Sequence, residues 1–252
     1  TDYDIVITKL NAAGTLALGA VGIGGSSNDG VNIRGKYINP DGVDATRRNY
    51  GDDARSEIIL DAAGNVLVAS CTQSSDFPVT PGTPIQGVFG GGRQDGVILK
   101  LTSNLSSVLF SSFFGGTGDD ACFVLSQNPL SGDIYVAGGT TGPNLPGDKT
   151  GVMQGAYQGG AVDGFITQIK NDGSAIVRTT FQGTSDNDMV YGIQFDKNGF
   201  PYVMGTTTGS WIVQAPGPTP IFSNPGSKQF ISKLQPNLSA YVYSTVFGTN
   251  AA

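Results

Sequence analysis

An internal repeat constrains the fold of this chain more than any other feature of its sequence. Four segments align without gaps, at residues 4–10, 95–101, 163–169 and 228–234. A glycine recurs in the same register, at positions 25, 116, 183 and 248. Two landmarks in one register define a repeated unit of about 65 residues, and the first interval carries an insertion of about 25.

Each unit contains four short apolar runs, which we name strands a, b, c and d in chain order. The runs are rich in β-branched and aromatic residues and are bounded by Gly, Asn, Asp or Pro, which is the pattern of β-strands. Strand c is the aligned segment itself. The other predicted strands are a at 57–61, 121–127 and 190–196, b at 65–70, 133–138 and 201–205, and d at 15–21, 107–114, 175–181 and 240–247.

Four antiparallel strands repeated in tandem predict an all-β fold, a β-propeller of four-stranded blades. The alternative is one large β-sandwich, which has no reason to repeat its turns at a regular interval. We expect a half blade at 1–30, an insertion loop at 31–53, and blades at 54–119, 120–187 and 188–252. Propellers close with four to eight blades, so these three and a half blades predict part of a larger propeller, for which seven blades would fit.

Several motifs in these units resemble a known bacterial repeat. They are Asp163-Gly-Phe-Ile on strand c, Phe110-Ser-Ser-Phe-Phe-Gly-Gly-Thr-Gly-Asp-Asp120 after strand d, Asp61-Ala-Ala-Gly-Asn-Val-Leu-Val68 in an a–b hairpin, and Asp76-Phe-Pro78 in the loop that follows. Together they resemble the SBBP-type β-propeller repeat. The order of units is similar to that of large gliding-motility-associated surface proteins of Bacteroidota, which the type IX secretion system exports. The resemblance implies a secreted or cell-surface protein.

Composition narrows the classes of function. The chain has 14 basic and 20 acidic residues and a net charge of −6, which argues against a nucleic-acid partner. It contains no histidine, so serine–histidine triads and the usual zinc sites are excluded. No run of about 18 apolar residues is present, so we expect no membrane insertion. The two cysteines, Cys71 and Cys122, would either pair or stay free.

The strand order places the connections on two opposite faces. The a–b and c–d turns are short and lie on one face, which we call the turn face. The long b–c loops, at about 72–94, 139–162 and 206–227, lie on the other face with the d–a connections and the insertion. Long loops on one face of a rigid scaffold often form an interaction surface. We therefore expect a protein or glycan partner at this long-loop face, although such loops also serve simply to cover sheet ends.

Acidic residues gather in the d–a connections, and they offer candidate metal ligands. The candidates are Asp52, Asp119, Asp120, Asp186 and Asp188. Carboxylates from several loops would suit calcium, which takes oxygen ligands. The alternative is structural, because aspartate and asparagine accept hydrogen bonds from nearby backbone amides and shape turns. In this alignment Asn28, Asp119 and Asp186 are equivalent, as are Asp29, Asp120 and Asn187.

Trp211 is the one tryptophan of the chain and a candidate ligand-binding residue. It would either stack on a sugar ring or pack between two blades. We expect a non-enzymatic structural or interaction module, such as an adhesin associated with gliding motility. The alternative is a carbohydrate- or calcium-binding, lectin-like propeller. A more remote alternative is an enzyme that acts on polysaccharides with paired carboxylates. We expect no catalytic residue and no cofactor, apart from the calcium alternative.

Overall fold

The computed structural model describes residues 2–33, 56–81 and 85–248. The described residues form β-strands, turns and loops, and none of them belongs to a helix that could span a membrane. The strands are β1 (Ile5–Leu10), β2 (Ala17–Ile23), β3 (Glu57–Leu60), β4 (Val66–Thr72), β5 (Asp95–Leu101), β6 (Val108–Phe114), β7 (Asp120–Gln127), β8 (Ile134–Thr140), β9 (Asp163–Ile169), β10 (Ile176–Gln182), β11 (Asp188–Phe195), β12 (Pro201–Thr207), β13 (Gln229–Leu234) and β14 (Tyr241–Phe247).

The strands form one two-stranded sheet and three four-stranded antiparallel sheets, each in simple chain order. We number them sheet 1 (β1–β2), sheet 2 (β3–β6), sheet 3 (β7–β10) and sheet 4 (β11–β14). This all-β arrangement is consistent with propeller blades. The bounds of the strands lie within two residues of those expected from the sequence, because their limits are set by local turn residues.

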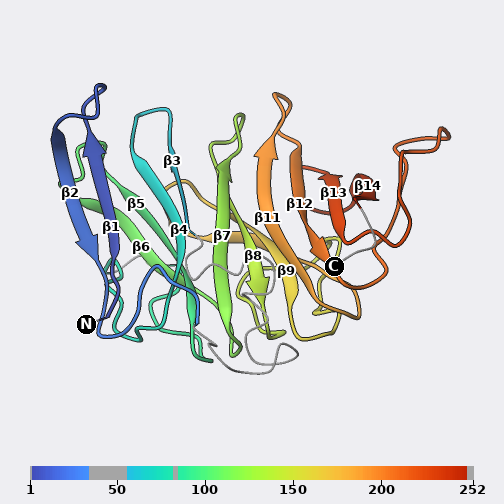
Figure 1. The fold of residues 1–252 in the computed structure, drawn as a ribbon, viewed down its shortest axis with the longest axis horizontal. Helices are drawn as coiled ribbons and strands as arrows, with labels where there is room; N and C mark the ends of the chain where they lie inside the picture. Colours follow the sequence, from blue (N-terminus) through green and yellow to red (C-terminus); the bar gives the residue numbers. More distant parts are fainter. Residues whose placement is uncertain (1, 34–55, 82–84, 249–252) are drawn as a thin grey trace.

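The sheets stand side by side in a row, as Figure 1 shows, with sheet 1 at one end and sheet 4 at the other. Strand a of each four-stranded sheet lies on one side of the row, and β7 contacts both β4 and β11 of the neighbouring sheets. The hairpin turns β1–β2, β3–β4, β7–β8 and β11–β12 all point to the same end of the molecule (Figure 1). The expected turn face is thus present. In the described part of the chain the row does not close into a ring.

The core lies between neighbouring sheets rather than within any one of them. One apolar cluster fills each junction: sheets 1 and 2, sheets 2 and 3, and sheets 3 and 4. Aromatic pairs cross the last two junctions, with ring centroids 5.1 Å apart for Phe114 and Phe165 and 5.4 Å for Phe123 and Tyr191. Each sheet therefore depends on its neighbours for the burial of its apolar faces.

The described residues on either side of the insertion both pair with β4. We expected residues 31–53 in the connection before strand a, but Asp29 already bridges Thr72 of β4, and the amide of Gly30 donates to the carbonyl of Cys71. The strand then resumes as β3, where Glu57 pairs with Ala69. The insertion therefore interrupts strand a of sheet 2. Residues 34–53 themselves lie outside the described residues.

The interruption coincides with a recurrent irregularity of the fold. In sheets 3 and 4, strand a carries a β-bulge, at the register shifts between Cys122 and Val124 and between Val190 and Gly192. The chain leaves strand a of sheet 2 at the equivalent point. A bulge already breaks the ladder there, so extra residues enter without disturbing further strand pairs. Sequence spacing alone could not distinguish this position from the preceding loop.

The long b–c loops turn back along strand d, the outermost strand of each four-stranded sheet. Backbone hydrogen bonds tie loop to strand, joining Gln86 to Phe113, Gln154 to Phe181, and Gln214 to Ser244. Outer strands otherwise expose unpaired backbone groups that invite association with other chains. These parts of the loops therefore cover sheet edges, which was the simpler of the two roles expected for them.

Candidate functional site

The five candidate metal ligands do not form one cluster. Asp52 lies outside the described residues. Asp119 binds Arg93, with 2.7 Å between Asp119 Oδ2 and an Arg93 guanidinium nitrogen, and thereby fastens the b–c loop of sheet 2. Asp186 is exposed. Asp120 and Asp188 are buried at two different sheet junctions. Among the residues that the structure describes, no group of three or more His, Cys, Asp or Glu side chains could hold a metal ion.

Asp120 instead shares its junction with an aspartate of sheet 2. It begins β7, and Asp95 begins β5; both side chains are fully buried. A Cβ atom built on Gly115 would lie 2.5 Å from Asp95 Oδ1 and 2.8 Å from Asp120 Oδ2, so the two carboxyl groups converge on this glycine. The amides of Gly90 and Gly116 donate to one oxygen of each carboxyl, at 2.6 and 2.7 Å.

The equivalent aspartates between sheets 3 and 4 are Asp163 and Asp188. Asp163 begins β9, Asp188 begins β11, and both are fully buried. The amide of Gln158 donates to Asp163, and the amide and hydroxyl of Thr184 donate to Asp188. A Cβ atom built on Gly183 would lie 2.5 Å from Asp163 Oδ1. We call Asp95/Asp120 and Asp163/Asp188 the junction pairs.

Burial dominates the electrostatics of the junction pairs. It raises the pKa of Asp95 and of Asp120 to about 7 each, against an ordinary value of 3.8, because ionisation in an apolar interior is costly. The pKa of Asp163 rises to about 7 and that of Asp188 to about 6 for the same reason. Hydrogen bonds from backbone amides oppose the effect of burial but do not cancel it. The negative charge of each partner adds to it in Asp120 and Asp163.

The sequence contained a signal for these pairs that we missed. The aspartates on strand c, Asp95 and Asp163, were treated only as part of the repeat. In both junction pairs, however, the two aspartates are separated by the same number of residues, and Asp4 and Asp29 have this separation too. The structure also moves two sequence equivalences by one position. Asp188, rather than Asn187, corresponds to Asp120, since each bridges a threonine on strand b. Gly115 likewise corresponds to Gly183.

Trp211 lies in the b–c loop of sheet 4 and packs into the interior. Its side chain is 8% exposed, its ring stacks on Phe230, and its Nε1 donates to Ser244 Oγ at 2.9 Å. Both of these contacts are to strands of sheet 4 itself, β13 and β14. Trp211 also lines a cavity of about 500 Å³ between sheets 3 and 4, together with Ile212 and Tyr241.

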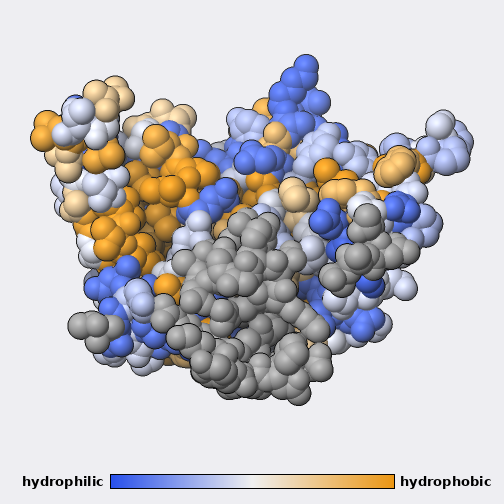
Figure 2. Space-filling view, viewed as in Figure 1, coloured by the Kyte–Doolittle hydropathy of each residue, from blue (hydrophilic) through white to orange (hydrophobic). Residues whose placement is uncertain are grey.

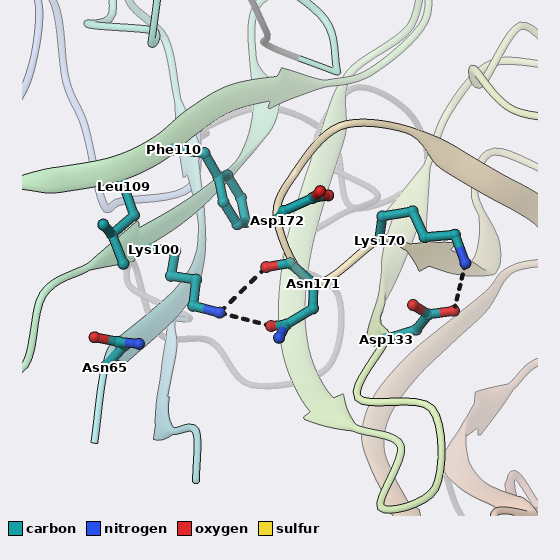
Figure 3. Close-up of a pocket in the computed structure, with 8 residues that line it drawn as sticks. All are labelled: Asn65, Lys100, Leu109, Phe110, Asp133, Lys170, Asn171 and Asp172. Carbon is teal, nitrogen blue, oxygen red and sulfur yellow. Dashed lines mark hydrogen bonds and ion pairs between the residues drawn. The ribbon is translucent and has the colours of Figure 1, made fainter. Parts of the chain in front are cut away.

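A second cavity, of about 530 Å³, opens on the turn face between sheets 2 and 3. Figure 3 shows Lys100 of sheet 2 directed toward Asn171 of sheet 3, with 2.6 Å between Lys100 Nζ and Asn171 Oδ1. Lys170 points to Asp133 beside them at 3.4 Å (Figure 3). Phe110 contributes an apolar wall. The pocket thus combines amide, ammonium and carboxylate groups with an aromatic side chain.

The equivalent pocket between sheets 3 and 4 has different chemistry. It measures about 320 Å³, and in the repeat register Gln168 replaces Lys100 while Arg178 replaces Phe110. The Arg178 guanidinium donates to the carbonyl of Asn237 at 2.8 Å. The scaffold therefore presents two similar hollows with different linings. Varied linings on a repeated backbone are what selective binding requires.

Exposed apolar side chains mark two further surfaces. Figure 2 shows apolar residues gathered over the end of the row that contains sheet 1. Exposed members on sheets 1 and 2 include Val6, Leu10, Leu18, Ile58 and Leu60. The b–c loops carry a second set, Val88, Ile212, Val213 and Phe222. Large exposed apolar groups on folded proteins often mark contacts with other molecules.

Cys71 and Cys122 are both buried and both free thiols. They belong to facing strands, β4 and β7. Burial, with a smaller contribution from Asp29, raises the pKa of Cys71 to about 12. Burial, followed by the nearby Asp120, raises the pKa of Cys122 as well. Thiols held protonated in the interior serve as small apolar packing groups.

Comparison with known proteins adds no family to these observations. No protein-family model matches the sequence, and a search of curated proteins gives no match. The resemblance to the SBBP-type repeat therefore stays a prediction.

Proposed function

We propose that this chain is a non-enzymatic structural and interaction module of a secreted, cell-surface β-propeller, and that it acts as an adhesin associated with gliding motility. The fold supports a scaffold of repeated sheets. The resemblance of its motifs to the SBBP-type repeat supports the location and the biological setting. The proposal assigns binding, rather than chemistry, to the exposed parts of the loops.

The recurrence of an ion pair at equivalent places in sheets 2 and 4 supports a scaffolding role. Lys100 binds Asp61 in sheet 2, with 3.0 Å between ammonium and carboxylate, and Lys233 binds Asp196 at the equivalent place in sheet 4, at 2.8 Å. Contacts that recur on more than one sheet serve the shared architecture, whereas a catalytic site is a single constellation. The junction pairs follow the same logic.

The single observation that carries the binding role is the set of exposed apolar side chains on the b–c loop of sheet 4. Phe222 is 74% exposed, Ile212 51% and Val213 45%. Ile212 also lines the cavity bordered by Trp211, and the loop that carries all three residues is fastened to β14 through Gln214. A fixed loop presents these groups in one arrangement, which lowers the entropy lost on binding. We assign a protein partner to this surface.

Adhesion assays test the binding role. Beads coated with the purified chain are applied to surfaces that carry bacterial outer-surface proteins or polysaccharides, and retention is counted. We expect the double variant Ile212→Ser/Phe222→Ser to lose retention at least tenfold. Leu130→Ser, which changes a 71% exposed residue of the turn face, should retain it. Equal retention by both variants, or turnover of a polysaccharide by the chain, would contradict the proposal.

A lectin-like role is the second candidate, and the turn-face pocket of Figure 3 favours it. Asn65, Asn171 and Asp172 line the pocket with hydrogen-bonding groups, which saccharides require. Glycan-array binding that is lost in Asn171→Ala and kept in Ile212→Ser/Phe222→Ser would favour this candidate over a protein partner.

We also propose that the four sheets belong to a larger, closed propeller. Apolar side chains on the outer faces of the row support this, among them Val6 and Leu18 on sheet 1 and Met204 on sheet 4, which are 70%, 55% and 47% exposed. Neighbouring blades would cover these faces as sheets 2 and 3 cover one another. The remainder of the parent propeller, or its flanking domains, would then be the first partner of this chain.

A further inference from the structure

The junction pairs leave one oxygen of each carboxyl group without a hydrogen-bond partner in the protein. These atoms are Oδ1 of Asp95, Asp120, Asp163 and Asp188, all fully enclosed. The neighbouring backbone donors are already engaged: the amide of Gly115 donates to Gln86 Oε1 at 3.0 Å, and the amide of Gly183 donates to Gln154 Oε1 at 2.8 Å. A buried carboxylate oxygen without a donor is costly, so each junction needs something to satisfy it.

One proton at each junction would satisfy these oxygens without any other bound group. Each pair has two open oxygens, one on each carboxyl, and a protonated carboxyl donates where an ionised one only accepts. Two ionised carboxylates in one buried site repel each other, as in other carboxyl dyads that share a proton. A calcium ion would require six to eight oxygens, and each junction pair offers two carboxylates.

We propose that each junction pair holds a single shared proton in the folded protein, and that its loss at rising pH weakens the contact between neighbouring sheets. The proton comes from solvent and returns to it, leaving two carboxylates at the junction. The junction pairs then act as two equivalent pH-dependent contacts, one between sheets 2 and 3 and the other between sheets 3 and 4.

The charged and titratable groups around the junction pairs favour the protonated state of each pair. Asp119 and the thiols of Cys122 and Cys71 lie near Asp95/Asp120, and Asp119 is already bound to Arg93. Tyr157, Tyr241 and Asp186 lie near Asp163/Asp188. All of these neighbours apart from the engaged Arg93 are neutral or negative, so they favour retention of the proton.

Two threonine hydroxyls act in the opposite direction. Thr140 lies beside Asp120 and Thr207 beside Asp188, and each lowers the pKa of its neighbouring carboxyl. The one proton of the Thr140 hydroxyl is donated to the carbonyl of Gly142 at 3.0 Å, so Asp120 Oδ1 is left without it. At both junctions the effect of burial is larger than that of the hydroxyl, so the pKa stays raised.

The pair Asp4/Asp29 provides a comparison within the same chain. Asp29 accepts hydrogen bonds at both oxygens, from Thr72 at Oδ1 and from Gly25 and Ser74 at Oδ2. Asp4 is exposed to solvent. With its donors supplied by the protein and its partner in water, this pair has no open buried oxygen, and we assign no shared proton to it.

The sign of the pH effect follows from the proton count. Above about pH 5 the unfolded chain leaves these carboxyls ionised, whereas each folded junction still binds a proton. Folding therefore takes up protons, and the folding equilibrium constant falls by about tenfold per pH unit for each pair. The loss continues as pH rises toward the folded pKa of about 7 and then levels off.

Urea unfolding of the whole chain between about pH 5 and pH 8 tests whether the junction pairs hold these protons. We expect the midpoint urea concentration of the wild type to fall as pH rises. Asp120→Asn removes one of the two shared protons, so it should about halve the slope of this dependence. It should be at least as stable as the wild type at pH 8, because its amide donates to Asp95 without titrating. Asp172→Asn, a change at an exposed carboxylate in the turn between β9 and β10, should keep the wild-type profile. A wild-type midpoint that stays constant or rises with pH would overturn the proposal.

Infrared spectroscopy of the folded protein gives a readout that does not depend on the stability of a variant. We expect a carboxylic-acid C=O stretch at pH 6 that disappears as pH rises past about 7. Absence of this band at pH 6 would refute the shared proton. Native mass spectrometry tests for a metal ion in place of the proton. A tightly bound cation at each pair in one-to-one ratio, together with a lower melting temperature after its removal by chelator, would overturn the proposal.

Discussion

The indole ring of Trp211 lies flat against the phenyl ring of Phe230, with ring centroids 3.7 Å apart and planes 8° from parallel. Phe230 stands on β13, and the Trp211 Nε1 donates to Ser244 Oγ on β14. One loop residue thus joins the b–c loop of sheet 4 to two of its strands. The aromatic face that a sugar would need is covered by the protein itself.

Removal of this side chain should destabilise the fold. We expect Trp211→Ala to lower the free energy of unfolding by about 3–5 kcal/mol, because a large buried ring leaves a cavity. Since the chain has one tryptophan, its fluorescence reports this site alone. Native emission should be blue-shifted, shielded from acrylamide and unchanged by sugars. Quenching as strong in the native as in the unfolded protein would contradict the packing that we describe.

The buried ion pair between Lys100 and Asp61 should matter more than the exposed one between Lys170 and Asp133. Both side chains of the first pair are 7% exposed, whereas the Lys170 side chain is 51% exposed. Lys100→Met leaves a buried carboxylate unpaired, so we expect a loss of about 3–5 kcal/mol in urea unfolding. Lys170→Met should cost about 0–1 kcal/mol. Similar losses in the two variants would refute this ranking.

Two glycines with similar backbone angles allow the cost of backbone strain to be measured apart from the cost of steric conflict. Gly151 has φ +67° and open space around it, whereas Gly173 has φ +72° and a Cβ atom there would lie 2.5 Å from Cγ of Phe110. We expect Gly151→Ala to cost about 1–2 kcal/mol, the strain of a left-handed conformation. Gly173→Ala should cost about 1–3 kcal/mol more, because it also displaces the ring. Equal losses in thermal or urea unfolding would show that the turn does not rest on Phe110.

The two free thiols should be inert in the folded protein. Cys71 and Cys122 are fully buried and their pKa values are raised, so little reactive thiolate is available. We expect alkylation with iodoacetamide at neutral pH to label neither cysteine until denaturant unfolds the chain, when both react. Mass spectrometry of the labelled peptides reads each site separately. Rapid labelling of the native protein would place at least one thiol at the surface.

The sequence predicted the strands well because their limits depend on neighbours in the chain. Turns such as Asp61–Asn65 are closed by the Asp61 carboxylate, which accepts from the amides of Ala63 and Asn65. Such turns recur and are visible in the letters alone. The alternation of apolar residues between them then fixes which segments form strands.

What the sequence did not reveal are contacts between residues that are far apart along the chain. Asp95 was visible only as the start of strand c, and Asp120 only as part of an acidic connection. Their interval, which recurs in the second junction pair, was the signal that linked them. The position of the insertion within strand a depended on the bridge between Asp29 and Thr72, which no local pattern encodes. The partner of Trp211 was likewise a distant residue, Phe230.

The central claim is that these sheets are blades of a larger, closed propeller that acts by binding. Light scattering on the purified chain, with thermal unfolding on the same sample, tests it most directly. We predict association beyond the 26.0 kDa monomer, because the outer faces of sheets 1 and 4 are uncovered. Covering those faces with the missing blades in a longer chain should restore a monomer. A monodisperse 26.0 kDa species that melts in one cooperative transition would contradict the claim.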